Sequence, residues 1–537
     1  MRLLNCNDLE LEEFFGTCPP YAILSHRWQD DEVSIHDMKN GTAPGRAGNA
    51  KIERCCLEAI KHGLQYAWID TCCIDKSSSA ELTEAINSMY RWYEDAKVCF
   101  VYLFDVDENE VNGQDSEALM KSRFAHSTWW SRGWTLQELI APSVVEFYNS
   151  NWEHLGSKHD LVERIATITG IHRKKLEGAD LECFSIAQRM SWASKRKTTR
   201  IEDVAYSLLG IFGVNMPMLY GEGKRAFLRL QEEIMKHSND HSLFAWSCSD
   251  SAQRGLLARS PTSFQDSNDI VPSVNRLSQV PYAVTNFGLS ISLAVLPWAM
   301  DTYFAALDCE TEDKYDSRVG IYLRLLPEKD QAARVSVDGR DLTTFELSFS
   351  GLVHQRHLYV RQRVWVTPPQ PERMYGFWVR TLPPMILFAK GSRYSAPDQP
   401  EPIYRDIILS RNTWDDNERL LLLKTGERGT AGRIWYESND RSKYTVFKLG
   451  FDDSFNPICF CTTHGVERSI QDLPVTDNHW IEYPVERKDG FLRGYRTMGL
   501  REDIHLVTIS ISKEVFGGQN MWVVDIHPSF AERGSGK

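Results

Sequence analysis

Four residues that could bind a nucleotide follow the first long apolar run of the chain. Tyr21–Leu24 is apolar, and Ser25, His26, Arg27 and Trp28 come directly after it. An arginine can clamp a phosphate group, and a tryptophan offers a face on which a base can stack. The alternative is a structural network in which Trp28 belongs to the core and Arg27 pairs with an acid. The residue types leave both interpretations open.

A second stretch combines aromatic rings with one carboxylate. Residues 129–139 (WWSRGWTLQEL) hold three tryptophans, including Trp134, and a single acid, Glu138. A carboxylate beside aromatic rings at the predicted start of a helix is a candidate for a functional site. However, Thr135 and Glu138 have the spacing of a helix capping box, and the tryptophans could be core residues. On spacing alone, we interpret Glu138 as structural.

Three other motifs are poor candidates for chemistry. The glycine-rich loop Gly41–Gly48 lacks the ending of a P-loop and does not join a strand to a helix. Ser25 or Cys72 could be a nucleophile, but the chain has no Gly-x-Ser-x-Gly elbow, and Asp70 would raise the thiol pKa. Cys459 and Cys461 have no second ligand pair and are predicted to lie on a strand. We therefore predict no metal and no cofactor.

The elements expected in residues 1–150 place these candidates together. Apolar runs at residues 21–25, 66–69, 98–103 and 144–148 alternate with helical patterns at 51–62, 78–96 and 135–140. This order predicts a parallel sheet with helices on both faces. Ligands bind such sheets at the carboxyl ends of the strands, which selects Ser25–Trp28, Asp70–Thr71 and Asp105.

The rest of the chain divides into two further parts. Residues 151–250 predict a helical extension, with helices at 158–169, 185–193, 201–212 and 223–237. Residues 251–537 predict an all-β domain with the turn spacing of a sandwich or barrel. Its clearest strands are Gly288–Leu293, Ile321–Leu326, Leu358–Thr367, Gly376–Arg380, Arg419–Leu423, Tyr444–Leu449, Ile504–Ile511 and Met521–Ile526.

Composition narrows the class of protein. The chain has 537 residues, a net charge of -12 and 11% aromatic residues. The acidic balance argues against a nucleic-acid binder. We expect no membrane association, because no apolar run is long enough to span a bilayer. We also expect no signal peptide, and the scattered cysteines suit a reduced, cytoplasmic protein.

Three blocks of the sequence resemble the fungal heterokaryon incompatibility (HET) domain. They are residues 21–28 (YAILSHRW), 66–76 (YAWIDTCCIDK) and 131–142 (SRGWTLQELIAP). Residues 189–193 (RMSWA), 199–203 (TRIED) and 219–223 (LYGEG) resemble an extension found in such proteins. The resemblance covers residues 1–250 and implies non-self recognition between fungal cells, in which incompatible fusion triggers cell death. The chain lacks the Walker A motif and the repeats that many members carry.

The HET domain is itself similar to the Toll/interleukin-1 receptor (TIR) domain, which implies a TIR/flavodoxin-like α/β fold. Residues 134–139 (WTLQEL) resemble the TIR motif whose glutamate is catalytic in enzymes that cleave NAD, although Thr135 stands where TIR domains often have cysteine. The resemblance implies Glu138 at the ribose of an NAD+ substrate. It further implies Arg27 at the pyrophosphate and Trp28 or Trp134 as a stacking wall, with Ser25, His26 and Asp70 lining the cleft.

Two functions follow from this resemblance. In the first, the chain is an NAD-consuming death effector, since a carboxylate would stabilise the positive charge that grows on the ribose as nicotinamide leaves. In the second, it is a non-enzymatic signalling module that self-associates, with the β-rich part as the sensor of a protein partner. In that case Glu138 is only a helix cap.

Overall fold

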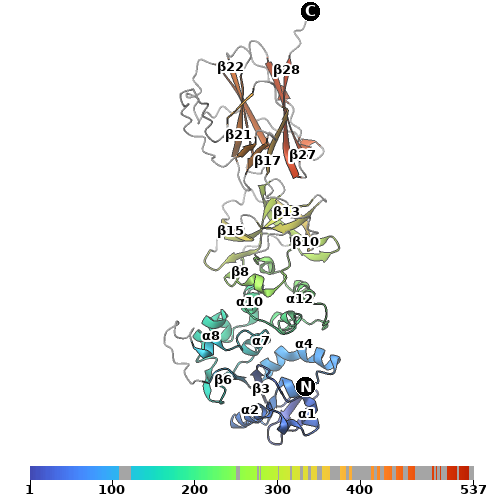
Figure 1. Cartoon of the computed structure of the whole chain (residues 1–537), viewed down its shortest axis with the longest axis vertical. Helices are drawn as coiled ribbons and strands as arrows, with labels where there is room; N and C mark the ends of the chain where they lie inside the picture. The colour runs from blue at the N-terminus through green and yellow to red at the C-terminus, as the bar shows by residue number, and fades with distance from the viewer. Residues whose placement is uncertain are drawn as a thin grey trace, which may run out of the picture.

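The architecture comes from a computed structural model of the whole chain (Figure 1). It describes residues 1–107, 122–248 and, with short gaps, 254–362. Beyond residue 362 it describes strands between residues 375 and 530. Along the long axis in Figure 1, a region of mixed helices and strands is followed by helices and then by strands alone.

A seven-stranded mixed sheet forms the N-terminal region. Its strands are β1 (Arg2–Asn5), β2 (Leu11–Glu13), β3 (Tyr21–His26), β4 (Tyr66–Trp68), β5 (Val98–Tyr102), β6 (Val145–Tyr148) and β7 (His154–Ser157). They lie in the order β2-β1-β4-β3-β5-β6-β7. The four predicted strands, β3 to β6, pair in parallel. The antiparallel strands at the two edges were not predicted.

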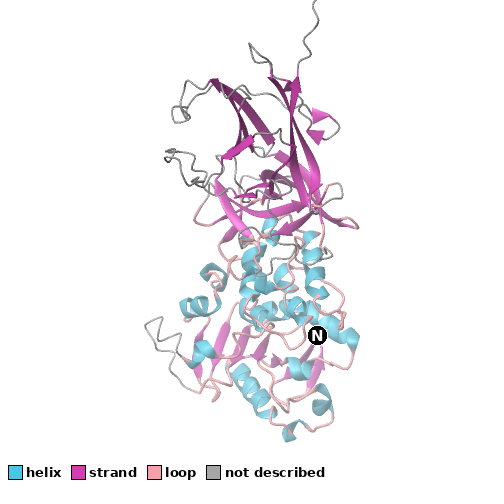
Figure 2. Cartoon of the chain, turned by 45° about the horizontal axis from the view of Figure 1, so that its top comes forward, coloured by secondary structure: helices cyan, strands magenta, loops and turns pink. Residues whose placement is uncertain are grey.

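Helices connect the parallel strands (Figure 2). They are α1 (Ile35–Lys39), α2 (Asn49–Lys61), α3 (Asp70–Cys73), α4 (Ser79–Asp95), α6 (Arg123–His126) and α7 (Thr135–Ile140). All six residues of β3 are buried, as a central strand covered by other elements requires. Ser78 caps α4 by accepting a hydrogen bond from the Glu81 amide.

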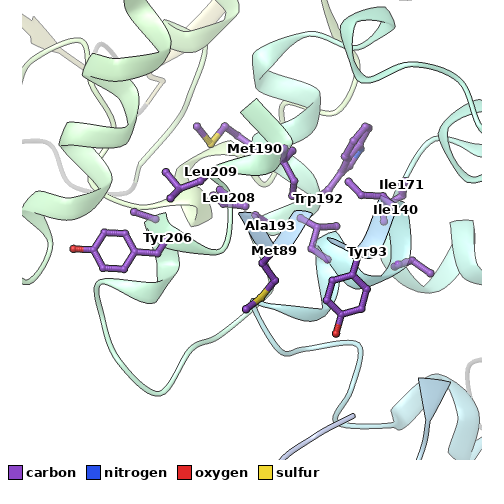
Figure 3. Packing of buried hydrophobic residues seen from close by; sticks show 14 of the residues in the cluster. Met89, Tyr93, Ile140, Ile171, Met190, Trp192, Ala193, Tyr206, Leu208 and Leu209 are labelled. Carbon is purple, nitrogen blue, oxygen red and sulfur yellow. The ribbon is translucent and has the colours of Figure 1, made fainter. Parts of the chain in front are cut away.

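A helical region follows the sheet and packs against it. It contains α8 (Val162–Thr169), α9 (Arg173–Leu176), α10 (Ile186–Ala193), α11 (Asp203–Tyr206) and α12 (Arg225–Met235). Figure 3 shows where the two regions meet, with Met89 and Tyr93 of α4 near Trp192 and Ala193 of α10. A capping box of Ser185 and Gln188 opens α10.

The continuous helix predicted over residues 201–212 is wrong, and two contacts across the fold fix the two ends of this segment. The Glu202 carboxylate accepts hydrogen bonds from the amides of Gly221 and Gly223. Gly210 lies so close to Tyr90 that a Cβ there would be 2.0 Å from the Tyr90 Cβ. The segment therefore forms the short α11 and a separate 3₁₀ turn at Gly210–Phe212.

Strands make up the C-terminal region, as predicted. Those before residue 361 are β8 (Ile270–Pro272), β9 (Ala283–Thr285), β10 (Gly288–Ala299), β11 (Thr302–Ala306), β12 (Cys309–Thr311), β13 (Ser317–Leu325), β14 (Gln331–Val335), β15 (Leu342–Glu346) and β16 (His354–Val360). The others are β17 (Tyr375–Thr381), β18 (Ile386–Ala389), β19 (Thr413–Asp415), β20 (Leu420–Leu423), β21 (Gly429–Glu437), β22 (Lys443–Phe451), β23 (Pro457–Gly465), β24 (Arg487–Lys488), β25 (Phe491–Leu492), β26 (Arg496–Thr497), β27 (His505–Phe516) and β28 (Gln519–Phe530).

The first of the large C-terminal sheets closes on itself. Its order is β11-β10-β16-β14-β13-β15, and β11 also pairs with β13. Every strand expected in this half overlaps an observed one, and Cys459 and Cys461 lie on β23 as predicted. Parts of three expected strands, Arg419, Ile504 and residues 363–367, fall outside the described residues. The sandwich arrangement of the C-terminal sheets and the division into residues 1–150, 151–250 and 251–537 stay predictions.

The closed sheet is joined firmly to the helical region. One continuous apolar core includes residues from Leu3 to Val360. At the junction, the buried Arg334 of β14 donates to the carbonyl oxygens of Phe244 and Trp246, and Arg254 forms an ion pair with Asp341. Within the described residues, no helix is long and apolar enough to cross a membrane.

Candidate functional site

Ser25 and Glu138 meet at the carboxyl end of β3. Ser25 is fully buried on the strand, and Glu138 lies on α7 with 7% of its surface exposed. The Ser25 hydroxyl donates a hydrogen bond to Oε2 of Glu138 and accepts one from the Trp129 indole at 2.8 Å. The carboxylate is therefore tied to a hydroxyl, and an indole holds that hydroxyl in place.

The predicted capping box at the start of α7 is wrong. Trp134 occupies the cap position, and Thr135 is already the first helical residue. The Thr135 hydroxyl donates to the carbonyl oxygens of Trp129 and Arg132. Within the described residues, the Glu138 carboxylate receives no hydrogen bond from a main-chain amide. A cap is therefore not the reason for an acid at this position.

Burial gives Glu138 an unusual acidity. Loss of solvent raises the pKa of Glu138 from 4.5 to about 7, although the hydrogen bond from Ser25 opposes this rise. The charge of Asp70 raises the pKa further, whereas Arg132 and Arg196 lower it. The carboxyl group therefore changes its charge close to neutral pH.

A second polar group surrounds Asp70, the first residue of α3. Asp70 accepts hydrogen bonds from the His26 ring at 3.0 Å and from the Trp28 indole at 2.7 Å. Burial acts to raise the pKa of Asp70, but Lys76 and these two hydrogen bonds outweigh it and hold the pKa well below its usual range. Asp70 is thus a fixed negative charge beside the Ser25–Glu138 pair.

Comparison with known protein families identifies the region that carries this site. Residues 21–121 match the family model described as heterokaryon incompatibility protein (HET). Residues 21–121 are therefore assigned to a HET domain. The matched residues include β3, α3 and Lys76, and they end before α7 and Glu138.

The chain is also similar to a curated relative. It is 50% identical over 226 residues to vegetative incompatibility protein HET-E-1 of Podospora anserina. The match covers 41% of this chain and 16% of that protein, so the chain spans a small part of the relative. Residues 225–253 match a domain of unknown function, DUF8212. No solved structure matches the chain significantly.

The HET domain brings some predicted site residues together and separates others. His26, Trp28 and Asp70 form one cluster, and Ser25 and Glu138 form a neighbouring pair. Trp28 is 40% exposed, so the interpretation of Trp28 as a core residue is wrong. The cysteine proposed as a nucleophile, Cys72, is buried in the apolar core.

Arg27 and Trp134 lie apart from these clusters. The Arg27 guanidinium lies 5.9 Å from the Phe104 ring centre and, within the described residues, has no acidic partner, so the expected pairing of Arg27 with an acid is wrong. The Trp134 indole donates to Asp203 of α11 at 3.4 Å. Asp105 accepts hydrogen bonds from Ser127 and Thr128 and so holds the loop before Trp129.

Sequence reasoning missed four residues of the site. Lys76 lies 3.2 Å from the centre of the Trp28 ring, and Arg132 lies 5.9 Å from it. The Trp129 indole donates a hydrogen bond to the Ser25 hydroxyl, and the charge of Arg196, which follows α10, lowers the pKa of Glu138. Lys76 ends the second signature block and Arg132 lies in the third, so both could have been suspected. No local pattern points to Arg196.

The ends of β3 and β4 combine acidic, polar, aromatic and cationic side chains. Within the described residues, no cluster of three His, Cys, Asp or Glu side chains is placed to hold a metal ion. The HET domain does bring one titrating carboxyl, one hydroxyl, an exposed indole and several cations to the ends of β3 and β4.

Proposed function

We propose that this chain is an effector of heterokaryon incompatibility whose HET domain triggers cell death by cleaving the nicotinamide–ribose bond of NAD+. Glu138 would be the catalytic carboxylate. The observation that carries this proposal is the placement of Glu138 beside Ser25, with a pKa of about 7 and, among the described residues, no main-chain amide bound to its carboxylate. The similarity to a vegetative incompatibility protein supports the biological role.

The topology of the sheet supports a ligand at this place. The parallel strands lie in the order β4-β3-β5-β6, which is the 2-1-3-4 order of flavodoxin-like folds and supports a TIR-like relationship. In such sheets a ligand binds where the order reverses, beyond the carboxyl ends of the first and third parallel strands. Those strands are β3 and β5, and Ser25 lies at the end of β3.

The chemistry needs one ionised carboxylate. Departure of nicotinamide leaves positive charge on the ribose, and a nearby carboxylate stabilises that charge most in the transition state. The Ser25 hydroxyl donates to Glu138 where a ribose hydroxyl of the substrate would donate instead. Nicotinamide leaves as a neutral group from a cationic ring, so no strong acid is needed.

Burial of Glu138 favours a second candidate function. With 7% of its surface exposed, Glu138 could serve only to join α7 to β3, and the HET domain would then signal by self-association without chemistry. The β-rich region would sense a protein partner in this alternative. Both candidates place the protein in the cytoplasm and both end in cell death, so death alone does not separate them.

Expression of the full chain in fungal cells separates the two candidates. The wild type should kill, and cellular NAD+ should fall before viability does. Glu138→Gln keeps the size of the side chain and a hydrogen-bond acceptor for Ser25, so it should accumulate normally and leave NAD+ and viability unchanged. Glu84→Gln, a change at an exposed position of α4, is the matched control. Death with unchanged NAD+ would favour signalling without catalysis.

A further inference from the structure

Two cations lie beside the exposed Trp28 indole. The Lys76 ammonium lies 3.2 Å from the centre of the Trp28 ring, and the Arg132 guanidinium carbon lies 5.9 Å from it. Within the described part of the chain, neither forms an ion pair with a carboxylate. The charge of Asp70 acts on Lys76, but the Asp70 carboxylate accepts its hydrogen bonds from His26 and Trp28. The two cations therefore lie at one indole without a direct ion pair to that acid.

The two positive charges also act on each other. Burial lowers the pKa of Lys76, and the charge of Arg132 lowers it further, while Asp70 opposes both. A nearby like charge disfavours the charged form of a group and an opposite charge favours it, so a further anion beside Lys76 and Arg132 would stabilise both cations. This pair of cations is therefore suited to bind an anionic ligand.

The helical region fixes the main chain at Arg132. The Arg196 side chain donates to the Arg132 carbonyl oxygen at 3.0 Å and to the Thr135 hydroxyl at 2.7 Å. The Gly133 amide donates to the Lys197 carbonyl oxygen at 2.8 Å, and the Lys197 amide donates to Ser131 at 2.7 Å. These bonds hold the Arg132 loop before any ligand arrives, which reduces the entropy lost on binding.

Gly133 shows how closely this loop lies against the helical region. A Cβ at position 133 would be 2.4 Å from Cγ2 of Thr198. Only glycine allows the backbone to approach so closely without displacing Thr198. The placement of Arg132 thus depends on residues 196–198, which lie outside the stretch that matches the HET family model.

We propose that Lys76 and Arg132 bind the pyrophosphate of a nucleotide that contacts the exposed Trp28 indole. This inference rests on the proposed function and names the residues that recognise the phosphates of NAD+. The charge of Arg132 also reaches Glu138, so phosphates held at Arg132 would lie near the carboxylate that faces the ribose. In this proposal Lys76 and Arg132 take the role that the resemblance implied for Arg27, whose guanidinium lies 5.9 Å from the centre of the Phe104 ring.

Binding measurements on the full chain carrying Glu138→Gln test this inference without cleavage. The probes are ADP, inorganic pyrophosphate and nicotinamide riboside, which has no phosphate, each titrated by calorimetry. Lys76→Gln and Arg132→Gln should each weaken binding of ADP and pyrophosphate by about tenfold or more, since each removes a charge-assisted contact. Binding of nicotinamide riboside should change little. Lys195→Gln, at an exposed lysine elsewhere, is the control.

The outcomes separate this inference from the proposed function. Equal affinity for ADP in the Lys76→Gln and Arg132→Gln chains, or no binding of ADP to the parent chain, would overturn the phosphate site. If NAD+ is cleaved with an unchanged KM after both substitutions, the phosphate site fails and catalysis stands. If ADP binds as expected but NAD+ is never cleaved, catalysis fails and the phosphate site stands. Lys76→Arg and Arg132→Lys, which keep the charge, should retain most of the affinity for ADP if the glutamine variants fold poorly.

Discussion

The buried carboxyl of Glu138 should make the stability of the HET domain depend on pH. Its pKa is 4.5 in an exposed chain and about 7 in the folded protein because burial disfavours the charged form. Between these values the folded state keeps a proton that the unfolded state releases, so stability falls as pH rises. Each pH unit in that interval costs about 1.4 kcal/mol, which gives a total loss of about 3 kcal/mol.

The Glu138→Gln substitution removes this dependence. Glutamine does not titrate and can still accept a hydrogen bond from Ser25. The unfolding free energy of the variant should therefore not show the decrease with pH that Glu138 causes in the wild type. The assay is urea unfolding of the full chain, followed by tryptophan fluorescence, from about pH 4.5 to about pH 8. The quantity to compare is the difference in unfolding free energy between wild type and variant at each pH. Glu84→Gln serves as the control for removal of an exposed carboxylate.

As pH rises, the unfolding free energy of the wild type should fall by about 3 kcal/mol relative to that of Glu138→Gln. The unfolding free energy of the Glu84→Gln control should change with pH nearly as that of the wild type does. A wild-type curve parallel to that of Glu138→Gln would show that the carboxyl ionises as easily in the folded chain as in the unfolded chain. The burial of Glu138 and its assignment as a group that titrates near neutral pH would then both be wrong.

Three further changes test the contacts around the site. Ser25→Ala removes the hydrogen bond that lowers the pKa of Glu138, so infrared titration of the carboxyl should give a pKa above that of the wild type. An unchanged pKa would contradict the hydrogen bond between Ser25 and Glu138. Trp129→Phe removes the indole donor to Ser25 and should cost about 1 kcal/mol in urea unfolding, whereas no loss would mean that this hydrogen bond contributes nothing. Gly133→Ala should cost about 1–3 kcal/mol in the same assay because its Cβ meets Thr198. Thr198→Ser removes the methyl group and should restore most of that loss; failure to do so would refute the steric explanation.

Local patterns were sufficient to predict the centre of the N-terminal sheet. The apolar runs that became β3, β4, β5 and β6 are buried by their neighbours, so hydrophobicity alone marks them. The rule that ligands lie at the carboxyl ends of parallel strands selected Ser25 and Asp70. The edge strands β1, β2 and β7 are short and partly polar, so they carry no comparable signal.

Contacts between distant residues could not be predicted from local patterns. Ser25 and Glu138 are 113 positions apart, and their hydrogen bond replaces the capping role that spacing suggested for Glu138. Arg196 contacts the Arg132 loop across 64 positions. Gly210 lies close against Tyr90 of α4, 120 positions earlier in the chain, in a segment whose sequence predicted one continuous helix. In each case, packing across the fold decided the local structure.

Nicotinamide release from NAD+ by the purified full chain tests the central claim most directly. The protein should be taken from cells in which it has become competent to kill, and the wild type compared with Glu138→Gln at equal concentration. The account predicts release by the wild type, with a rate that rises as pH passes about 7, and no release above background by the variant. Equal release by both proteins would show that Glu138 is not the catalytic group.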